Sequence, residues 1–441
     1  MSTESRLVSL DVFRGMTIAG MVLVNNPGTW SAIYDPLEHA EWHGLTPTDW
    51  IFPFFLFIVG VAIPIALDKY RDGRSRAGVY RKIITRSVSI FLLGLAISVV
   101  PFFQFGASDA PDALKLLVWL AFTAALFFLL LRSWKWFAVT LGLGLAGVAA
   151  LNLAGYTLYD YDIGTMRIMG VLQRIAVVYL ITAVLFLNFN WRHLVGISVV
   201  LLLGYWLIMT VIPVPGCEVT TINDKACNLA AYIDRSILTE SHIWRSAKVF
   251  DPEGLLSTIP AIVTCISGVL AGMWLRRSSD PENSISDIRS SNYAAVSGLF
   301  FFGVVLLGAG YIWSSYFPLN KSLWTSSYVL VTGGLALLVL GCCYWLIDIQ
   351  GYRRWARPFV IFGVNALPLF VFSGIMARML GAYRVAGGDG KLIPLQKWIF
   401  ETAFLPLAQP IDASLAYAVS FILLWLGLMW LLYRKEIYLK V

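Results

Sequence analysis

About twelve long apolar stretches run through this chain, and they constrain its fold more than any other feature. A helix needs roughly 20 apolar residues to cross the hydrocarbon core of a bilayer. Stretches of about that length lie near residues 8–26, 50–67, 87–103, 113–131, 136–154, 169–187, 194–212, 255–275, 293–316, 325–348, 358–378 and 411–433. We therefore expect an all-α polytopic membrane protein with about 12 transmembrane helices.

The composition supports this class. Of the 441 residues, 58% are hydrophobic and 13% are charged, whereas a soluble domain is about half apolar and a quarter charged. The net charge of +7 does not indicate nucleic-acid binding, because the basic residues gather in alternate connections. Arg6, Asp11 and Arg14 interrupt the first stretch, so we expect it to remain as a membrane helix and not to be removed as a signal peptide.

The distribution of lysine and arginine predicts the topology. Basic residues cluster within 68–86, 132–135, 276–277, 353–357 and 434–440, whereas the connection 25–49 contains no lysine or arginine. The positive-inside rule then places both termini in the cytoplasm and 25–49 on the outer side. Two larger connections, 213–254 and 379–410, become periplasmic loops. We expect residues 1–441 to form a single transmembrane domain.

Cysteines give a weaker indication of the compartment. Cys217 and Cys227 share the outer connection 213–254 and could form a disulfide in an oxidising periplasm, but their spacing alone leaves this open. Cys265, Cys342 and Cys343 lie within apolar stretches and are expected to be small packing residues.

Two of the four histidines, His39 and His43, stand within the connection 25–49. In a helix they would share one face, which suits a metal pair, but no HExxH motif is present and Asp49 is too generic to count as a third ligand. They could also satisfy loop hydrogen bonds. A third reading is chemistry at the membrane surface, where titratable groups sit on a loop between two rigid helices.

Polar residues at the ends or inside of apolar stretches have two readings each. Asn25 could cap its helix or donate to a developing oxyanion. Asn365, in a stretch that Pro368 should disturb, could bond to another helix or line a site.

Charged residues in or beside the stretches also have two readings. Arg174 and Gln173 could form structural contacts, with Asp160 and Asp162 as partners of Arg167 and Arg174, or they could contact a substrate. Asp11 and Arg14, three residues apart, could pair with each other or meet an anionic ligand. No nucleotide-binding loop motif is present.

The order of these motifs resembles the heparan-alpha-glucosaminide N-acetyltransferase family, the lysosomal enzyme and its bacterial relatives. The matching strings are Ser9-Leu10-Asp11-Val12-Phe13-Arg14-Gly15, Val24-Asn25, His39-Ala40-Glu41-Trp42-His43-Gly44-Leu45-Thr46-Pro47-Thr48-Asp49, Arg167-Ile168-Met169-Gly170-Val171-Leu172-Gln173-Arg174, Asp251-Pro252-Glu253-Gly254-Leu255-Leu256-Ser257-Thr258, Leu323-Trp324-Thr325-Ser326-Ser327 and Phe362-Gly363-Val364-Asn365-Ala366-Leu367. They cover nearly the whole chain in order.

The resemblance implies transfer of acetyl from acetyl-CoA to the amine of a glucosamine-type sugar on the outer side of the membrane. It implies that His39 is the active-site histidine, as general base or as the acetyl acceptor, and that Asn25 acts beside it. Other motif residues are assigned to substrate binding: His43, Trp42, Asp49, Arg174, Gln173, Glu253 and Asn365. Arg14 and Asp11 are assigned to the cofactor, and no metal is expected.

The helical pair within 113–154 looks inserted relative to the lysosomal enzyme. A bacterial relative would lie in the inner membrane, in contact with its lipids, and would need an acceptor other than heparan sulfate. A homodimer is left open. Two other functions are retained: a 12-helix secondary transporter of a sugar or small solute, and an O-acyltransferase of a surface polysaccharide. A transporter should place its polar residues near the middle of the bilayer, whereas here they gather at the outer end.

Overall fold

The computed structural model describes residues 7–71, 76–277, 285–388 and 390–439. Arg6 and Arg74 lie outside the described residues. The long helices are α1 (Val8–Asn25), α2 (Ile51–Leu67), α3 (Arg76–Val99), α4 (Asp112–Leu130), α5 (Trp134–Leu153), α6 (Val171–Asn188), α7 (Trp191–Val211), α9 (Thr258–Arg277), α10 (Ile285–Ser314), α11 (Ser326–Cys343), α13 (Ala366–Ala382) and α15 (Pro410–Arg434). Shorter helices are α8 (Leu229–Leu238), α12 (Arg357–Val364) and α14 (Leu395–Ile399). Strands β1 (Arg384–Ala386) and β2 (Leu392–Pro394) form a small antiparallel pair.

The expected helical membrane architecture is confirmed. Among the described residues, 11 helices are long and apolar enough to cross a membrane, or 12 if the bent pair of α12 and α13 counts as one span. Each falls on one of the predicted stretches. The sidedness of the termini and loops stays a prediction.

The eleventh span is broken, but not at the proline itself. The helices α12 and α13 meet at an angle of 82° around Asn365, three residues before Pro368. Proline has no N–H to bond the carbonyl of Val364, and its ring crowds that carbonyl. The first helix therefore ends at Val364, and Pro368 lies in the first turn of the next one, where no such N–H is needed.

The chain divides into two compact units. The first contains residues up to Thr17, His39–Leu95 and Arg167–Arg357, and the second contains Ile18–Glu38, Ala96–Met166 and Pro358–Val441. The boundaries cut through α1 and α3.

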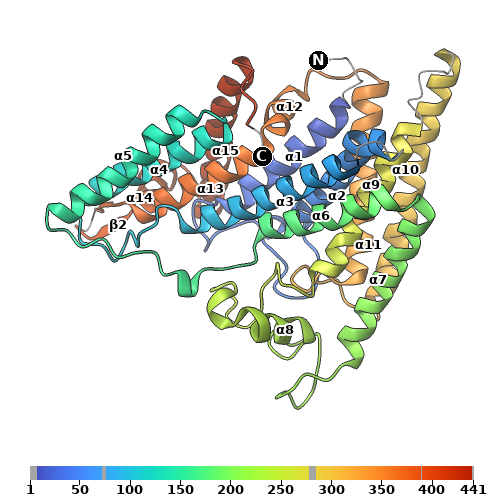
Figure 1. Cartoon of the computed structure of the whole chain (residues 1–441), viewed down its shortest axis with the longest axis horizontal. Coiled ribbons are helices and arrows are strands. Elements are labelled where there is room, and N and C mark those ends of the chain that lie inside the picture. The colour runs from blue at the N-terminus through green and yellow to red at the C-terminus, as the bar shows by residue number, and fades with distance from the viewer. Residues whose placement is uncertain (1–6, 72–75, 278–284, 389, 440–441) are drawn as a thin grey trace. The chain divides into compact units, whose positions relative to one another are not determined.

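In the first unit, α2 packs closely along α9 (Figure 1). A Cβ placed on Gly60 would lie 2.0 Å from the carbonyl oxygen of Cys265, and one on Gly268 would lie 2.0 Å from that of Phe57. Membrane helices gain little from apolar burial against each other, so close backbone approach over small residues is a main source of their association. The two glycines thereby fix the position of α2, which carries the candidate site at its first turn.

The second unit contains the hairpin of α4 and α5, which lie side by side in Figure 1. These helices span the stretch that the resemblance treats as an insertion. In the same unit, the side-chain amide of Asn365 donates to the carbonyl of Ile437 at 3.0 Å, and its oxygen accepts from the N–H of Leu439 at 3.1 Å. Asn365 therefore anchors the C-terminal segment.

Candidate active site

The candidate site lies where an irregular segment of the first unit enters α2. Thr46 and Asp49 form a capping box around a short 3₁₀ turn, Pro47–Trp50, that leads directly into the helix. A proline at the first position suits this turn, because no partner is needed for its missing N–H. Asp49 is thereby fixed as part of the helix start.

Hydrogen bonds to its carboxylate and its backbone carbonyl fix Asp49 in place. Oδ2 accepts hydrogen bonds from the N–H of Ala40 at 3.2 Å and from the N–H and hydroxyl of Thr46 at 3.0 and 3.1 Å. The buried hydroxyl of Tyr328, on α11, donates to the Asp49 carbonyl at 2.7 Å. Only Oδ1 remains to face His39.

His39 and Asp49 form a close pair. Nδ1 of His39 lies 2.7 Å from Oδ1 of Asp49, and the His39 side chain is 51% exposed whereas that of Asp49 is 1% exposed. An ionised carboxylate only accepts hydrogen bonds, so Nδ1 carries the proton and the lone pair is on Nε2. A buried acid thus orients an accessible imidazole, which is the arrangement of a general base.

Lys321 is the third member of this group. It comes from the connection between α10 and α11, and its Nζ lies 3.0 Å from Nδ1 and 3.2 Å from Nε2 of His39. The same Nζ lies 3.7 Å from Asp49. Burial lowers the pKa of Lys321 below its ordinary value, although the charges of Asp49 and Glu253 oppose this.

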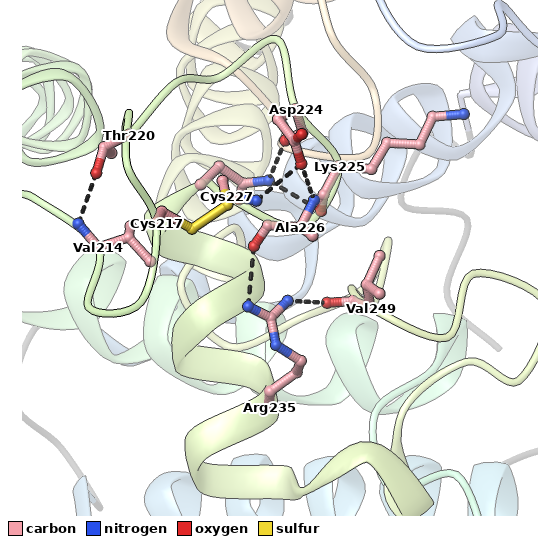
Figure 2. The surroundings of a disulfide bond; sticks show 10 residues. Val214, Cys217, Thr220, Asp224, Lys225, Ala226, Cys227, Arg235 and Val249 are labelled. Atoms are coloured by element: carbon pink, nitrogen blue, oxygen red, sulfur yellow. Dashed lines mark hydrogen bonds between the residues drawn. A yellow bond between two sulfur atoms is a disulfide. The ribbon is translucent and has the colours of Figure 1, made fainter.

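Trp42 and His43 are held by the disulfide loop of the same unit. Cys217 and Cys227 are bonded to each other (Figure 2), which decides the pairing that their spacing left open. Trp42 Nε1 donates to the carbonyl of Ile222 at 2.9 Å, and His43 Nε2 lies 2.9 Å from Oδ1 of Asn223. Both partners lie between the two cysteines, so the disulfide loop supports the segment that carries His39.

The two histidines do not share a helix face. Residues 39–46 are not helical, so the spacing that would suit a metal pair is not realised. His43 instead contacts Asn223 and, through Nδ1, Asn320 at 3.3 Å. No group of three or more potential metal ligands occurs in the part of the chain that the structure describes.

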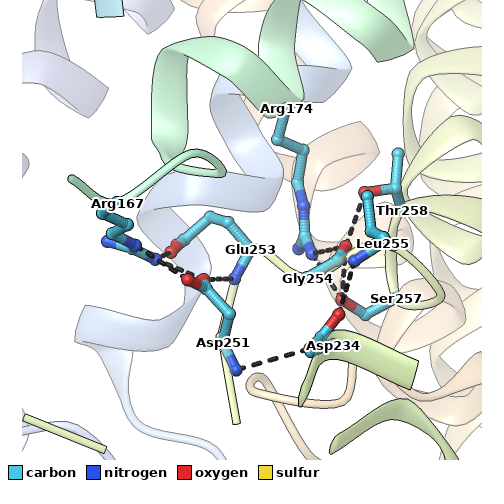
Figure 3. Close-up of polar contacts among 9 residues, drawn as sticks. All are labelled: Arg167, Arg174, Asp234, Asp251, Glu253, Gly254, Leu255, Ser257 and Thr258. Atoms are coloured by element: carbon cyan, nitrogen blue, oxygen red, sulfur yellow. Dashed lines mark hydrogen bonds and ion pairs between the residues drawn. The ribbon is translucent and has the colours of Figure 1, made fainter. Parts of the chain in front are cut away.

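A buried ion network lies within the segment 167–258 (Figure 3). Arg167 pairs with Asp251, with Nε at 2.9 Å from Oδ2, and it also contacts the carboxylate of Glu253. Burial opposes ionisation of Glu253, but nearby cations, foremost Arg167, hold its pKa below the ordinary value. The suggested partners Asp160 and Asp162 are therefore wrong for Arg167. Asp162 caps its own short turn by accepting from the N–H of Gly164.

Arg174 and Gln173 are buried in α6. Arg174 donates to the carbonyl of Gly254 at 3.1 Å and to the hydroxyl of Ser257, and its guanidinium lies 5.0 Å from the ring of Trp324. Its Nε and Nη1 have no hydrogen-bond partner among the described residues. Gln173 packs against α3, because a Cβ on Gly94 would lie 2.5 Å from its Oε1. Both residues thus join α6 to neighbouring segments.

Asp234, on α8, completes this network. It accepts from the N–H of Leu255 at 2.9 Å, and burial raises its pKa to about 6. It lies directly against Gly254, where a Cβ would come within 2.0 Å of its carboxylate. A side chain at position 254 would therefore require the Asp234 carboxylate to move.

Four other predicted residues lie elsewhere. Asp11 and Arg14 contact each other at 3.5 Å on one face of α1, as their spacing allowed. Asn25 is exposed at the end of α1, in the second unit. The C-terminal anchor Asn365 described above is buried in the same unit. The structure thus brings together His39 and Asp49, and separately Glu253 and Arg174 within one network.

Lys321 and Asp234 were missed by sequence reasoning. For Lys321 a signal existed, since it is a lone lysine in a connection predicted to lie outside, where basic residues are depleted. It also stands two residues before the motif that begins at Leu323. Asp234 offered no such signal, because an aspartate on an amphipathic helix is ordinarily solvated.

Comparisons with known proteins agree with the motifs. Residues 6–159 match the family model described as heparan-alpha-glucosaminide N-acetyltransferase, catalytic. The chain is 26% identical to the human heparan-alpha-glucosaminide N-acetyltransferase over 99% of its length and 24% identical to the mouse protein over 100%. It spans 60% and 61% of those two relatives, respectively. The resemblance inferred from the motifs is thus confirmed, and His39 and Asp49 lie inside the matched segment.

Proposed function

We propose that this protein is a membrane-embedded acetyltransferase that moves an acetyl group from acetyl-CoA to the amine of a glucosamine-type sugar. One observation carries the proposal. The His39–Asp49 pair lies at the start of a membrane helix, with His39 half exposed and Asp49 buried, inside the segment that matches a catalytic-domain model. An oriented base at the edge of an apolar helix bundle suits transfer between a soluble donor and a sugar.

The chemistry follows from the geometry of the pair. A sugar amine is protonated near neutral pH and must lose a proton before it attacks the thioester carbonyl. Nε2 of His39 takes that proton, the new C–N bond forms, the C–S bond breaks, and the imidazolium returns a proton to the departing thiolate. The second proton of the nitrogen, lost as the neutral amide forms, passes to solvent. Asp49 stabilises the imidazolium while it exists. A two-step route, in which Nε2 first accepts the acetyl group, uses the same orientation.

The remaining assignments are part of this proposal. Asn25 donates to the oxyanion of the tetrahedral intermediate. Glu253 and Asp49 supply negative charge that suits a cationic acceptor, and Trp42 and His43 provide an aromatic wall. Arg174, Gln173 and Asn365 assist substrate binding, and Arg14 with Asp11 contacts the acetyl-CoA.

The sidedness and location are proposed on two grounds. A disulfide is typical of an oxidising compartment, so the bond between Cys217 and Cys227 supports an outer position for the loop 213–254. The alternation of basic segments supports cytoplasmic termini. Together they favour a multi-pass protein of a bacterial inner membrane, with its acceptor on the periplasmic side and the chain acting as one transmembrane domain.

The decisive experiment is transfer of labelled acetyl from acetyl-CoA to glucosamine by purified protein in detergent. His39→Ala should abolish transfer, whereas Lys248→Met, at an exposed site between α8 and α9, should not. Label that stays on the protein when the acceptor is omitted, and disappears in His39→Ala, would select the two-step route. Uptake of a sugar into liposomes without any acetyl transfer would refute the acetyltransferase and favour the transporter.

A further inference from the structure

Lys321 lies directly beside the imidazole that would act as the base. Its Nζ lies 3.0 Å from Nδ1 and 3.2 Å from Nε2 of His39, so its charge faces the ring as a whole. Because Nδ1 carries a proton bound by Asp49, Nε2 holds the lone pair that would accept a proton. The acceptor amine, which is also an ammonium before it reacts, has to come to this same atom.

Two carboxylates favour the ammonium form of Lys321, although burial, the larger effect, lowers its pKa. Asp49 lies 3.7 Å from Nζ of Lys321, and the charge of Glu253 also acts on it. Glu253 is itself paired with Arg167. Arg174 also acts on Glu253. His43, on the same segment as His39, is turned to Asn223 and Asn320.

The two charges beside His39 act in opposite directions. Asp49 favours the imidazolium, because opposite charges within hydrogen-bond distance stabilise the ionised form. The Lys321 ammonium disfavours the imidazolium, because two cations about 3 Å apart repel each other. Without Lys321, Asp49 would act alone and His39 would be protonated, and so unable to accept a proton, at a higher pH.

We propose that Lys321 is a positioning residue whose charge keeps His39 unprotonated until the ammonium of the acceptor reaches Nε2. This inference rests on the proposed function for the identity of the acceptor.

The test combines a titration with a rate profile. The protein has four histidines, so labelled imidazoles can be followed by NMR and the His39 signal assigned with His39→Asn. In Lys321→Met we expect the midpoint of the His39 titration, and the acid limb of kcat/KM, to move up by about one pH unit, which is about a tenfold loss of rate below that limb. Lys321→Arg, which keeps the charge, should restore both, and Lys248→Met should change neither.

A purely structural role for Lys321 predicts a different result. The rate would then fall equally at every pH, and the midpoint of the His39 titration would stay in place. An unmoved midpoint in a folded Lys321→Met protein overturns this proposal, whether or not acetyl transfer is detected. A moved midpoint in a protein whose wild type transfers no acetyl group overturns the proposed function alone.

Discussion

Replacing Asp49 with asparagine should reverse the tautomer of His39. Oδ2 of Asp49 accepts three hydrogen bonds, from the N–H of Ala40 and from the N–H and hydroxyl of Thr46, while Oδ1 faces Nδ1 of His39. An asparagine must keep its oxygen toward the three donors, which places its NH₂ group against Nδ1. That nitrogen then has to accept, so the ring proton moves to Nε2 and the base loses its lone pair on the substrate side.

The expected cost falls on the rate more than on stability. A general base contributes about 10²–10⁴-fold to the rate, and a histidine held in the wrong tautomer loses a factor of up to about 10⁴. The asparagine keeps all four hydrogen bonds, but none of them is made to a charged carboxylate, so the loss of stability should be about 1–2 kcal/mol. Acetyl transfer from labelled acetyl-CoA measures the first effect, and thermal unfolding in detergent measures the second.

An exposed aspartate supplies a matched control for this substitution. Asp35→Asn changes an exposed aspartate, outside the His39 contacts, by the same atom. It should leave kcat/KM near the wild-type value. A folded Asp49→Asn protein that transfers acetyl within about threefold of the wild-type rate would show that His39 does not depend on Asp49, and the tautomer argument would be wrong.

Three further predictions concern other parts of the molecule. Burial raises the pKa of Asp234 to about 6 in the folded protein, whereas its pKa in the unfolded chain is near 4. Between these two pH values the folded state holds a proton that the unfolded state has lost, so stability falls as pH rises. At pH 7.5, Asp234→Asn should therefore raise the free energy of unfolding by up to about 3 kcal/mol, seen as a higher thermal midpoint, and near pH 4 it should have little effect. An equal gain in stability at both pH values contradicts this. Removing the disulfide with Cys217→Ser and Cys227→Ser should lower the local stability of its loop by about 3 kcal/mol and expose 218–226 to limited proteolysis. The value of kcat/KM should also fall, because Trp42 loses its support. Unchanged proteolytic cleavage would count against this prediction. Asn25→Ala should lower kcat about 10²–10³-fold with acetyl-CoA binding retained, as for loss of an oxyanion donor; a change confined to KM would assign it to binding instead.

The membrane helices were predictable because their requirement is local. Each must bury about 20 residues in hydrocarbon, and that need is written in consecutive residues, as α4 and α5 illustrate. The break in the eleventh span was placed at Pro368, but the bend lies at Asn365, because proline disrupts the hydrogen bond of the preceding turn. The proline in the sequence thus predicted the helix break and, to within three residues, its position.

The candidate site was predictable only in part. The histidines and Asp49 belong to one short string, so the motif alone was enough to identify them as candidate site residues. Their partners could not be found in this way: Lys321 lies 282 residues from His39 along the chain, and Asp251 lies 84 residues from Arg167.

By itself, the sequence determined the helical membrane class, the positions of the spans and the string that contains His39, because each depends on neighbouring residues and the solvent they require. Only the tertiary structure decided which charge meets which. It placed Lys321 beside the imidazole of His39, paired Arg167 with Asp251 and Glu253, and set the disulfide loop against Trp42. Such pairings depend on how helices such as α2 and α9 pack through their small residues. Close packing brings residues that are distant in the sequence together, and nothing in the local sequence of either residue indicates its partner.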